Sequence, residues 1–279
     1  MKLAVQFVDA FTDKAFQGNT AAVVITTSWL PDRVMQSIAT ENNLSETAFV
    51  VKNKRDHYHI RWFSPIKEID FCGHATLATA FVIFNRSMNE GSPLTRISFI
   101  ADAVGEMTVD YTASGEIQMS FPEQPPQKIE AYPEALLRGL SIPPQEVYVN
   151  QQAYFVIFEN EKDVIEVKQK KEHLMQLAPL DVVVTAKSKQ YDFISRYFWP
   201  ANGGDEDPVT GSIHAGLAPL WAERFKQSGV EQSVFNAYQA SKRGGKLTCH
   251  IKAGRVLVSG RAVLYLEGMI HLPNEVIEG

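Results

Sequence analysis

The chain has 279 residues, of which 45% are hydrophobic and 21% are charged, so it can bury two cores of ordinary size. Its net charge of −5, without a basic stripe, makes nucleic acid and anionic membranes poor partners. No apolar run approaches the roughly 20 residues of a membrane span, and the start resembles a strand more than a signal peptide. The two cysteines form no disulfide framework, so we expect a cytoplasmic protein.

The first half of the chain combines short strands with two helices. An amphipathic helix is expected after Pro31, ending near Asn43, and a longer apolar helix runs from His74 to about Arg86. The proline-rich stretch 122–126 has the composition of a linker. Alternating apolar residues and glycine turns predict strands at 2–11, 21–26, 47–51, 57–63, 96–100, 106–111 and 116–121.

After the linker the pattern begins again. Arg61–Pro65 resembles Arg196–Pro200 at an offset of 196 − 61 = 135, and Gly73 matches Gly211 at 211 − 73 = 138. A nearly constant offset of this length indicates a duplicated domain. We therefore predict an α+β fold with two pseudo-symmetric antiparallel β-barrel-like domains, each wrapped around a central helix. The predicted domains are 1–122 and 123–279, and the last strand may cross back to the first domain.

A glycine opens the central helix of each half. Gly73 lies in the segment Asp70–Ala78, and Gly211 lies in Asp207–Ala218. A helix N-terminus leaves backbone N–H groups unpaired, and a glycine there lets an anionic group approach them closely. A duplicated fold should place the two termini opposite each other across a cleft. We expect this cleft to bind a small carboxylate-bearing substrate.

The two halves are expected to differ at Glu46. This residue lies between the amphipathic helix and the hairpin, whereas the corresponding stretch 180–185 is expected to place valine there. One carboxylate in one copy is what an enzyme with a single acid/base needs. The alternative is that Glu46 only begins a strand or caps a turn.

Three further polar residues flank the two glycines. His74 should stand at a helix N-terminus, where the dipole favours a neutral imidazole that exchanges one hydrogen bond with a substrate. Asp207 precedes Pro208, which leaves its side chain to cap a helix or to orient a ligand. For His74, Asp207 and Ser212 the alternative is helix capping without a ligand role. The other histidines lack metal-ligand spacing, so no metal site is predicted.

Five motifs occur in this order along the chain: Val8–Thr12, Phe16–Asn19, Asn43–Thr47, Cys72–Thr76 and Asp207–Ser212. Together they resemble the PhzF-like family of phenazine-biosynthesis proteins across essentially the whole chain. The resemblance implies a diaminopimelate-epimerase-like fold and no cofactor. It implies that Glu46 shuttles a proton, that His74 and Asp207 assist as catalytic residues, and that the founding activity isomerises a dihydro-hydroxyanthranilate. It also implies substrate binding by Asn19, Ser45, Gly73, Gly211 and Ser212.

Two alternatives to the isomerase remain. In related epimerases and racemases, two cysteines precede the helix-opening glycines, and here those positions hold Cys72 and Thr210. Threonine is a poor base, so symmetric racemisation is disfavoured, but a Cys72/Thr210 dehydratase or epimerase stays open. A catalytically silent member that binds a metabolite or a protein is the second alternative. A homodimer is compatible with either.

Overall fold

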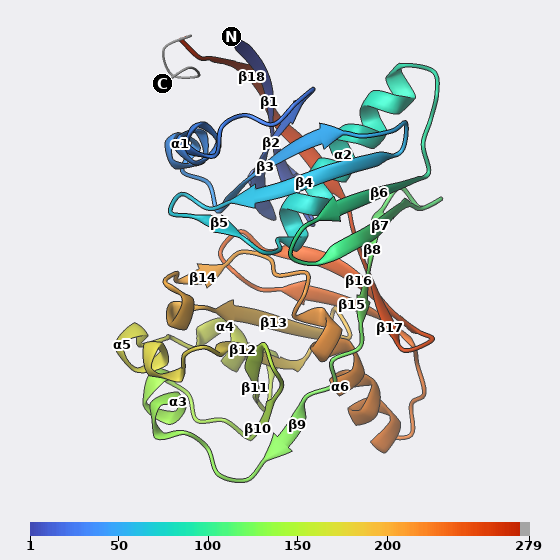
Figure 1. Cartoon of the computed structure of the whole chain (residues 1–279). Coiled ribbons are helices and arrows are strands. Elements are labelled where there is room, and N and C mark those ends of the chain that lie inside the picture. The colour runs from blue at the N-terminus through green and yellow to red at the C-terminus, as the bar shows by residue number, and fades with distance from the viewer. Residues whose placement is uncertain (274–279) are drawn as a thin grey trace. The chain divides into compact units, whose positions relative to one another are not determined.

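The computed structural model describes residues 1–273 (Figure 1). The chain forms two compact units, one from Met1–Ser120 and the chain from Ser259 onward, the other from Phe121–Val258. Strands and helices of the first unit are β1 (Lys2–Ala10), β2 (Asn19–Thr26), α1 (Asp32–Asn42), β3 (Glu46–Lys52), β4 (His57–Phe63), β5 (Glu68–Ile69), α2 (Gly73–Asn89), β6 (Arg96–Ala101), β7 (Gly105–Tyr111), β8 (Ile117–Pro122, entering the second unit) and β18 (Ala262–His271).

The second unit has a similar succession of strands but more short helices between them. It contains β9 (Gln127–Ile129), α3 (Glu134–Gly139), β10 (Glu146–Val149), β11 (Ala153–Ile157), α4 (Glu161–Glu166), α5 (Lys171–Leu174), the 3-10 turns Met175–Leu177 and Pro200–Asn202, β12 (Asp181–Lys187), β13 (Phe193–Phe198), β14 (Glu206–Asp207), α6 (His214–Gln227), β15 (Val234–Gln239), β16 (Gly245–Lys252) and β17 (Arg255–Gly260).

Strand pairing in the first unit follows the order β18–β1–β2–β3–β4–β6–β7–β8, with β5 also paired to β4. The pairs are antiparallel except β2–β3 and β4–β6. The second unit repeats this pattern as β9–β10–β11–β12–β13–β15–β16, with β14 on β13 and parallel pairs at β11–β12 and β13–β15. The shared pattern shows that the two units are copies of one fold.

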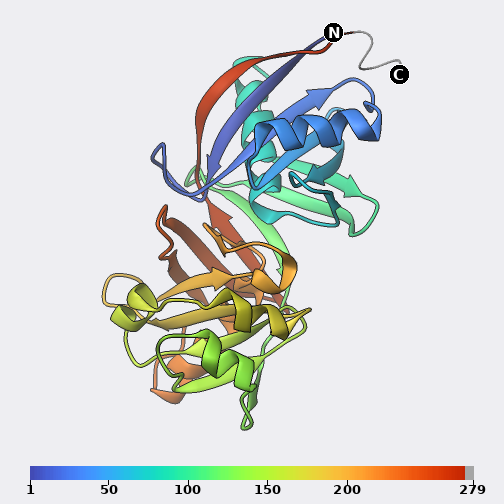
Figure 2. The same cartoon turned by 90° about the vertical axis from the view of Figure 1, so that its left-hand side faces the viewer.

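The curled sheet of the first unit is covered on both faces. α2 contacts β1, β2, β3, β7 and β18 on one face, and most of its residues are buried. On the other face α1 packs Val34, Met35 and Ile38 against β1 and β2 (Figure 2). Because both faces are buried, a strand such as β2 carries consecutive apolar residues instead of alternating ones.

α6 is the counterpart of α2 in the second unit and contains a proline. Pro219 has no N–H with which to pair the carbonyl of Ala215 one turn earlier. The backbone N–H of Gln124 donates to that carbonyl instead, at 3.0 Å. The linker-like stretch after β8 therefore satisfies the backbone of the central helix.

The boundaries of the two units can be compared with the predicted domains, 1–122 and 123–279. The first unit ends at Ser120, and the chain from Ser259 onward returns to it. β18 pairs with β1 from Lys2↔His271 to Ala10↔Ala262, and the two strands lie side by side in both views (Figures 1 and 2). Among residues 1–273, no helix is long and apolar enough to cross a membrane.

Candidate active site

Local backbone structure positions Glu46 and His74 in the first unit. α1 ends at Asn42, and its C-cap residue Asn43 adopts a left-handed conformation with φ 49°. Ser45 then precedes Glu46, the first residue of β3. Cys72 precedes α2 in an extended conformation and makes no side-chain capping bond, so Gly73 and His74 form the first turn of the helix. The N-terminal end of β3 thus carries Glu46, and the N-terminal end of α2 carries His74.

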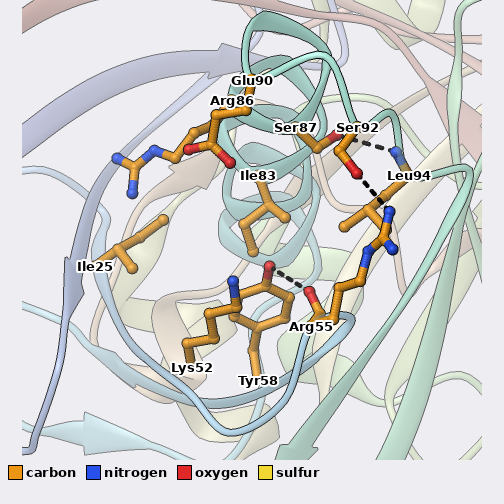
Figure 3. Close-up of a pocket in the computed structure, with 10 residues that line it drawn as sticks. All are labelled: Ile25, Lys52, Arg55, Tyr58, Ile83, Arg86, Ser87, Glu90, Ser92 and Leu94. Atoms are coloured by element: carbon orange, nitrogen blue, oxygen red, sulfur yellow. Dashed lines mark hydrogen bonds between the residues drawn. The ribbon is translucent and has the colours of Figure 1, made fainter.

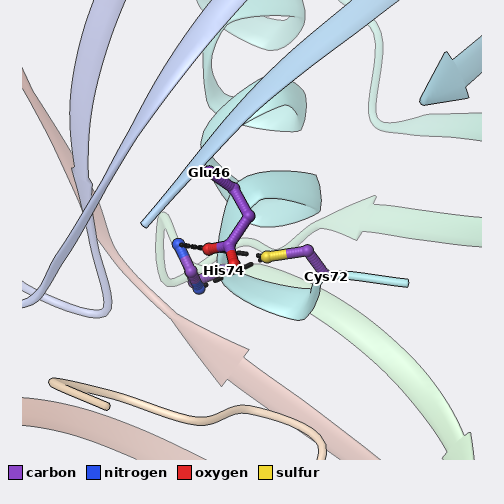
Figure 4. A group of neighbouring side chains, drawn as sticks. All are labelled: Glu46, Cys72 and His74. Carbon is purple, nitrogen blue, oxygen red and sulfur yellow. Dashed lines mark hydrogen bonds and ion pairs between the residues drawn. The ribbon is translucent and has the colours of Figure 1, made fainter. Parts of the chain in front are cut away.

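Glu46, His74 and Cys72 form a compact, nearly buried cluster (Figure 4). His74 Nε2 lies 3.0 Å from Glu46 Oε2, and Cys72 Sγ lies 3.4 Å from His74 Nδ1. The three residues are 9%, 5% and 7% exposed. Within the described chain, no aligned hydrogen-bond donor reaches Glu46 Oε2 despite its short distance to the imidazole. This oxygen can therefore accept a proton from a bound molecule.

Asn19 fixes the tautomer of His74. Its side-chain Nδ2 lies 3.0 Å from His74 Nδ1, and an amide nitrogen only donates. Nδ1 is therefore the acceptor and the ring proton is on Nε2, facing the Glu46 carboxylate. His74 Nε2 and Glu46 Oε2, 3.0 Å apart, thus lie within reach of each other for proton transfer.

The loop before Asn19 is held by a buried carboxylate that the sequence analysis did not single out. Asp9 accepts from the Thr20 hydroxyl at 2.5 Å and from the backbone N–H of Phe16 at 2.9 Å. Gly18 in this loop has φ +67°, and a Cβ there would lie 2.1 Å from the carbonyl oxygen of Ala10. Asp9 and Gly18 thereby set where β2 begins and where Asn19 stands. Asp9 lies in one of the motifs of the resemblance, which is the signal that could have identified it.

The cluster also has the composition of a metal-binding group. One ligand atom from each of Glu46, Cys72 and His74 lies within 4.8 Å of the others. Carboxylate, thiolate and imidazole together suit zinc. Asn19 occupies His74 Nδ1, however, and the proton on Nε2 would have to leave before that nitrogen bound a metal. The expectation of no metal therefore stays a prediction, one that a chelator can test.

Asp207, Gly211 and Ser212 lie in the second unit around the start of α6. The hydroxyl of Thr210 donates to Asp207 Oδ2 at 2.5 Å, and Gln239 Nε2 donates to the backbone carbonyl of Asp207 at 2.7 Å. Gln152 Nε2 donates to Ser212 Oγ at 3.0 Å. Asp207 and Ser212 are each held at defined positions within this unit.

The strand registers correct one expectation about Glu46. Phe49 pairs with Arg61 and Val184 pairs with Arg196, so the offset of 135 also applies to β3 and β12. The residue equivalent to Glu46 is then 46 + 135 = 181, an aspartate and not a valine. Asp181 accepts from the Tyr197 hydroxyl at 2.7 Å and from Asn202 at 2.8 Å. The expected carboxylate-for-valine difference between the halves is therefore wrong.

What distinguishes the two copies is the partner of the carboxylate. Glu46 faces an imidazole, whereas Asp181 is bound by a phenol and an amide. In the sequence match of Gly73 to Gly211, Ser212 takes the place of His74. The structure thus brings Glu46, His74 and Asn19 together, with Ser45 and Gly73 adjacent in sequence. The predicted residues Asp207, Gly211 and Ser212 lie in the second unit.

Comparison with known proteins gives the family. The sequence profile of the PhzC-PhzF family, described as phenazine biosynthesis-like protein, matches residues 8–268. An uncharacterized isomerase of Pseudomonas aeruginosa is 43% identical over 272 residues, covering 98% of this chain and 100% of the relative. A crystal structure of a PhzF family protein from Enterococcus faecalis superposes with a TM-score of 0.89 at 39% identity, covering 98% of this chain and 100% of that one.

The fold extends to more distant proteins. A hydroxyproline epimerase from Agrobacterium vitis has a TM-score of 0.57 at 12% identity, covering 96% of this chain and 92% of the other. At this identity the likeness concerns the fold alone, and it confirms the predicted α+β, epimerase-like fold class. The match of the profile over nearly the whole chain identifies it as a member of the PhzC-PhzF family of phenazine biosynthesis-like proteins.

Proposed function

We propose that this protein is an isomerase of a small carboxylate-bearing metabolite in which Glu46 moves a proton to and from carbon. The carrying observation is the buried cluster in which Glu46 Oε2 stands 3.0 Å from a neutral His74 and has no aligned donor among the described residues. The name isomerase carried by the Pseudomonas aeruginosa relative supports the same reaction class.

The reaction follows from the properties of a single enclosed carboxylate. Ionised Glu46 takes a proton from one carbon of the substrate and becomes a neutral acid. It then returns that proton to another carbon within reach, so that a double bond shifts and no net oxidation occurs. His74 Nε2 lies 3.0 Å from the oxygen proposed to carry the proton, and Asn19 holds the ring in that position.

The substrate carboxylate has a suitable binding position at the start of α2. The helix has 17 residues, and Cys72 does not cap it through its side chain. The N–H groups of its first turn point toward this end, where the helix dipole favours a negative charge. Gly73 carries no side chain at this end of the helix. The role of Ser45, which precedes Glu46 in the chain, is proposed from the sequence motif. The roles of Asp207, Gly211 and Ser212 are proposed from the sequence motif.

Cys72 supports a second candidate mechanism. Its sulfur contacts the same imidazole as Glu46, so a thiol-based epimerase or dehydratase would use this cluster as well. Its partner in that mechanism would be Thr210, whose hydroxyl already donates to Asp207. An alcohol is a poor base at neutral pH because it ionises only at very high pH, which favours Glu46.

The experiment that separates the two mechanisms is solvent deuterium incorporation. A panel of amino acids, cyclic hydroxy acids and dihydroaromatic carboxylates is incubated with the enzyme in deuterated buffer and followed by proton NMR and mass spectrometry. For any compound that exchanges, Glu46→Gln should lower the exchange rate by roughly 10²–10⁴-fold. Cys72→Ala should leave the exchange rate close to that of the wild type. The opposite pattern would assign the chemistry to the thiol.

A further inference from the structure

A pocket of about 210 Å³ lies in the first unit, at the end of α2 opposite His74 (Figure 3). The turns between His74 and Arg86 span 12 residues, or about 18 Å at 1.5 Å per residue, so the pocket is separate from the Glu46 cluster. It shares no residue with that cluster. Its lining comes from β2, the β3–β4 hairpin, the last turns of α2 and the segment that follows, namely Ile25, Lys52, Arg55, Tyr58, Ile83, Arg86, Ser87, Glu90, Ser92 and Leu94.

The inner part of the pocket is apolar. Ile83 and Tyr58 are 3% and 5% exposed, and Ile25 and Leu94 are half-buried beside them. The Tyr58 hydroxyl donates to the backbone carbonyl of Arg55 at 3.2 Å. Burial raises the pKa of Tyr58, so it remains a neutral phenol at physiological pH. This part of the pocket therefore suits a small uncharged ring or alkyl group.

The rim of the pocket is positively charged. Lys52, Arg55 and Arg86 supply three cations and Glu90 one carboxylate, a balance of 3 − 1 = +2 in a chain whose net charge is −5. None of the three cations has a carboxylate within 4.0 Å among residues 1–273. By the same criterion Arg61 contacts both Asp32 and Glu68. The pocket thus gathers cations whose charge the described chain does not neutralise.

The cations of the hairpin are better placed to bind an anion than the one on the helix. Arg86 lies in the last turn of α2, where its charge offsets the negative end of the helix dipole. Lys52 and Arg55 come from the β3–β4 hairpin, with Lys52 on one side of Tyr58 and the Arg55 guanidinium on the other, beside Ser92 (Figure 3). An Arg55 guanidinium nitrogen donates to the Ser92 hydroxyl at 2.5 Å, which orients the guanidinium. Within residues 1–273, Lys52 and Arg55 are therefore the two cations of the lining that neither an ion pair nor the end of α2 engages.

We propose that this pocket binds a small amphipathic organic anion, with its carboxylate or phosphate on Lys52 and Arg55 and its apolar part against Tyr58 and Ile83. The volume is below the roughly 300 Å³ at which pockets for drug-sized ligands begin, so the ligand is no larger than a single substituted ring or short chain. The anion is held by charge-assisted hydrogen bonds and the body by burial of apolar surface.

The test uses three probes that separate charge from apolar contact. Benzoate carries both features, benzyl alcohol carries only the ring, and inorganic phosphate carries only the anion. Binding to the full chain is followed by chemical-shift changes of the backbone amides and by calorimetry. Benzoate should bind saturably, with shifts at the ten lining residues, and at least about tenfold more tightly than benzyl alcohol. Phosphate should compete with benzoate but bind more weakly.

Variants show whether the named cations are responsible. Lys52→Ala combined with Arg55→Ala should weaken benzoate binding by about tenfold or more. Lys54→Ala is the matched control, since this lysine is exposed on the same turn and does not line the pocket. It should change affinity less than about twofold. Thermal unfolding confirms that each variant is folded. Equal binding of benzoate and benzyl alcohol, equal losses in both variants, or no saturable binding would overturn the proposal.

Discussion

Acid titration of His214 is predicted to limit the stability of the second unit. Its side chain is fully buried, and Nδ1 donates to the carbonyl oxygen of Thr210 at 2.9 Å. Burial lowers the pKa of His214 from 6.5 to about 4, although the carbonyls of Thr210 and Gly211 partly oppose the shift. The ring is therefore neutral in the folded protein at pH values where the unfolded chain already binds a proton.

The sign and size of the effect follow from this difference. The stabilisation is present above pH 6.5 and is lost as the pH falls from 6.5 toward about 4, because only the unfolded state gains the proton. At about pH 5 the unfolded histidine is 6.5 − 5 = 1.5 pH units below its pKa, whereas the folded one is still mostly neutral. Because one unit corresponds to about 1.4 kcal/mol, lowering the pH from about 7.5 to about 5 should remove about 2 kcal/mol of unfolding free energy through His214. Other titrating groups add to this change.

The substitution His214→Gln isolates the contribution, because glutamine cannot titrate and all other groups remain. Urea unfolding of both proteins is followed by circular dichroism at a series of pH values. The wild type should be the more stable protein at neutral pH, and its advantage should shrink by about 2 kcal/mol toward pH 5. A difference that stays constant across this range would refute the assignment of a buried neutral imidazole at His214.

Three other predictions concern stability and metal dependence. Burial raises the pKa of Asp181 above its ordinary value of 3.8, so the wild type should lose stability relative to Asp181→Asn as the pH rises from 3.8. A difference in urea unfolding that does not change with pH would contradict this. Gly18→Ala should lower Tm by more than Gly91→Ala does. The two glycines have similar φ values, but a Cβ at Gly91 would meet nothing within 4 Å, whereas one at Gly18 would clash with the Ala10 carbonyl. Equal losses of Tm would contradict the clash. Dialysis against a chelator should leave deuterium exchange unchanged, and restoration of lost exchange by zinc would assign the Glu46, Cys72 and His74 group to a metal.

Much of the fold could be predicted because its signals are local or repeated. The helix beginning near His74 and the strands around it follow from apolar periodicity, glycine turns and the recurrence of Arg61 and Gly73 in the second half. The pairing of β18 with β1 had no local signal, since it joins residues about 260 positions apart. The parallel pairs β2–β3 and β4–β6 likewise depend on how the sheet closes around α2.

The candidate site shows the same division. Glu46, His74 and Asn19 could be named from motifs, but their contacts required the folded positions of β2, β3 and α2. Asp181 was missed because the second half was aligned by its apolar run, whereas the offset of 135 already measured at Arg61 leads to the aspartate. The basic pocket was missed because Lys52, Arg55 and Arg86 come from separate elements and form no sequence motif.

The measurement that tests the central claim most directly is deuterium exchange by Glu46→Gln with a compound that the wild-type enzyme exchanges. Glutamine keeps the size of the side chain and removes its titratable group, while the start of α2 is unchanged. Exchange should fall by roughly 10²–10⁴-fold, the usual contribution of a general acid/base, and calorimetry should show that the compound still binds. Exchange at the wild-type rate in this variant would contradict Glu46 as the proton carrier.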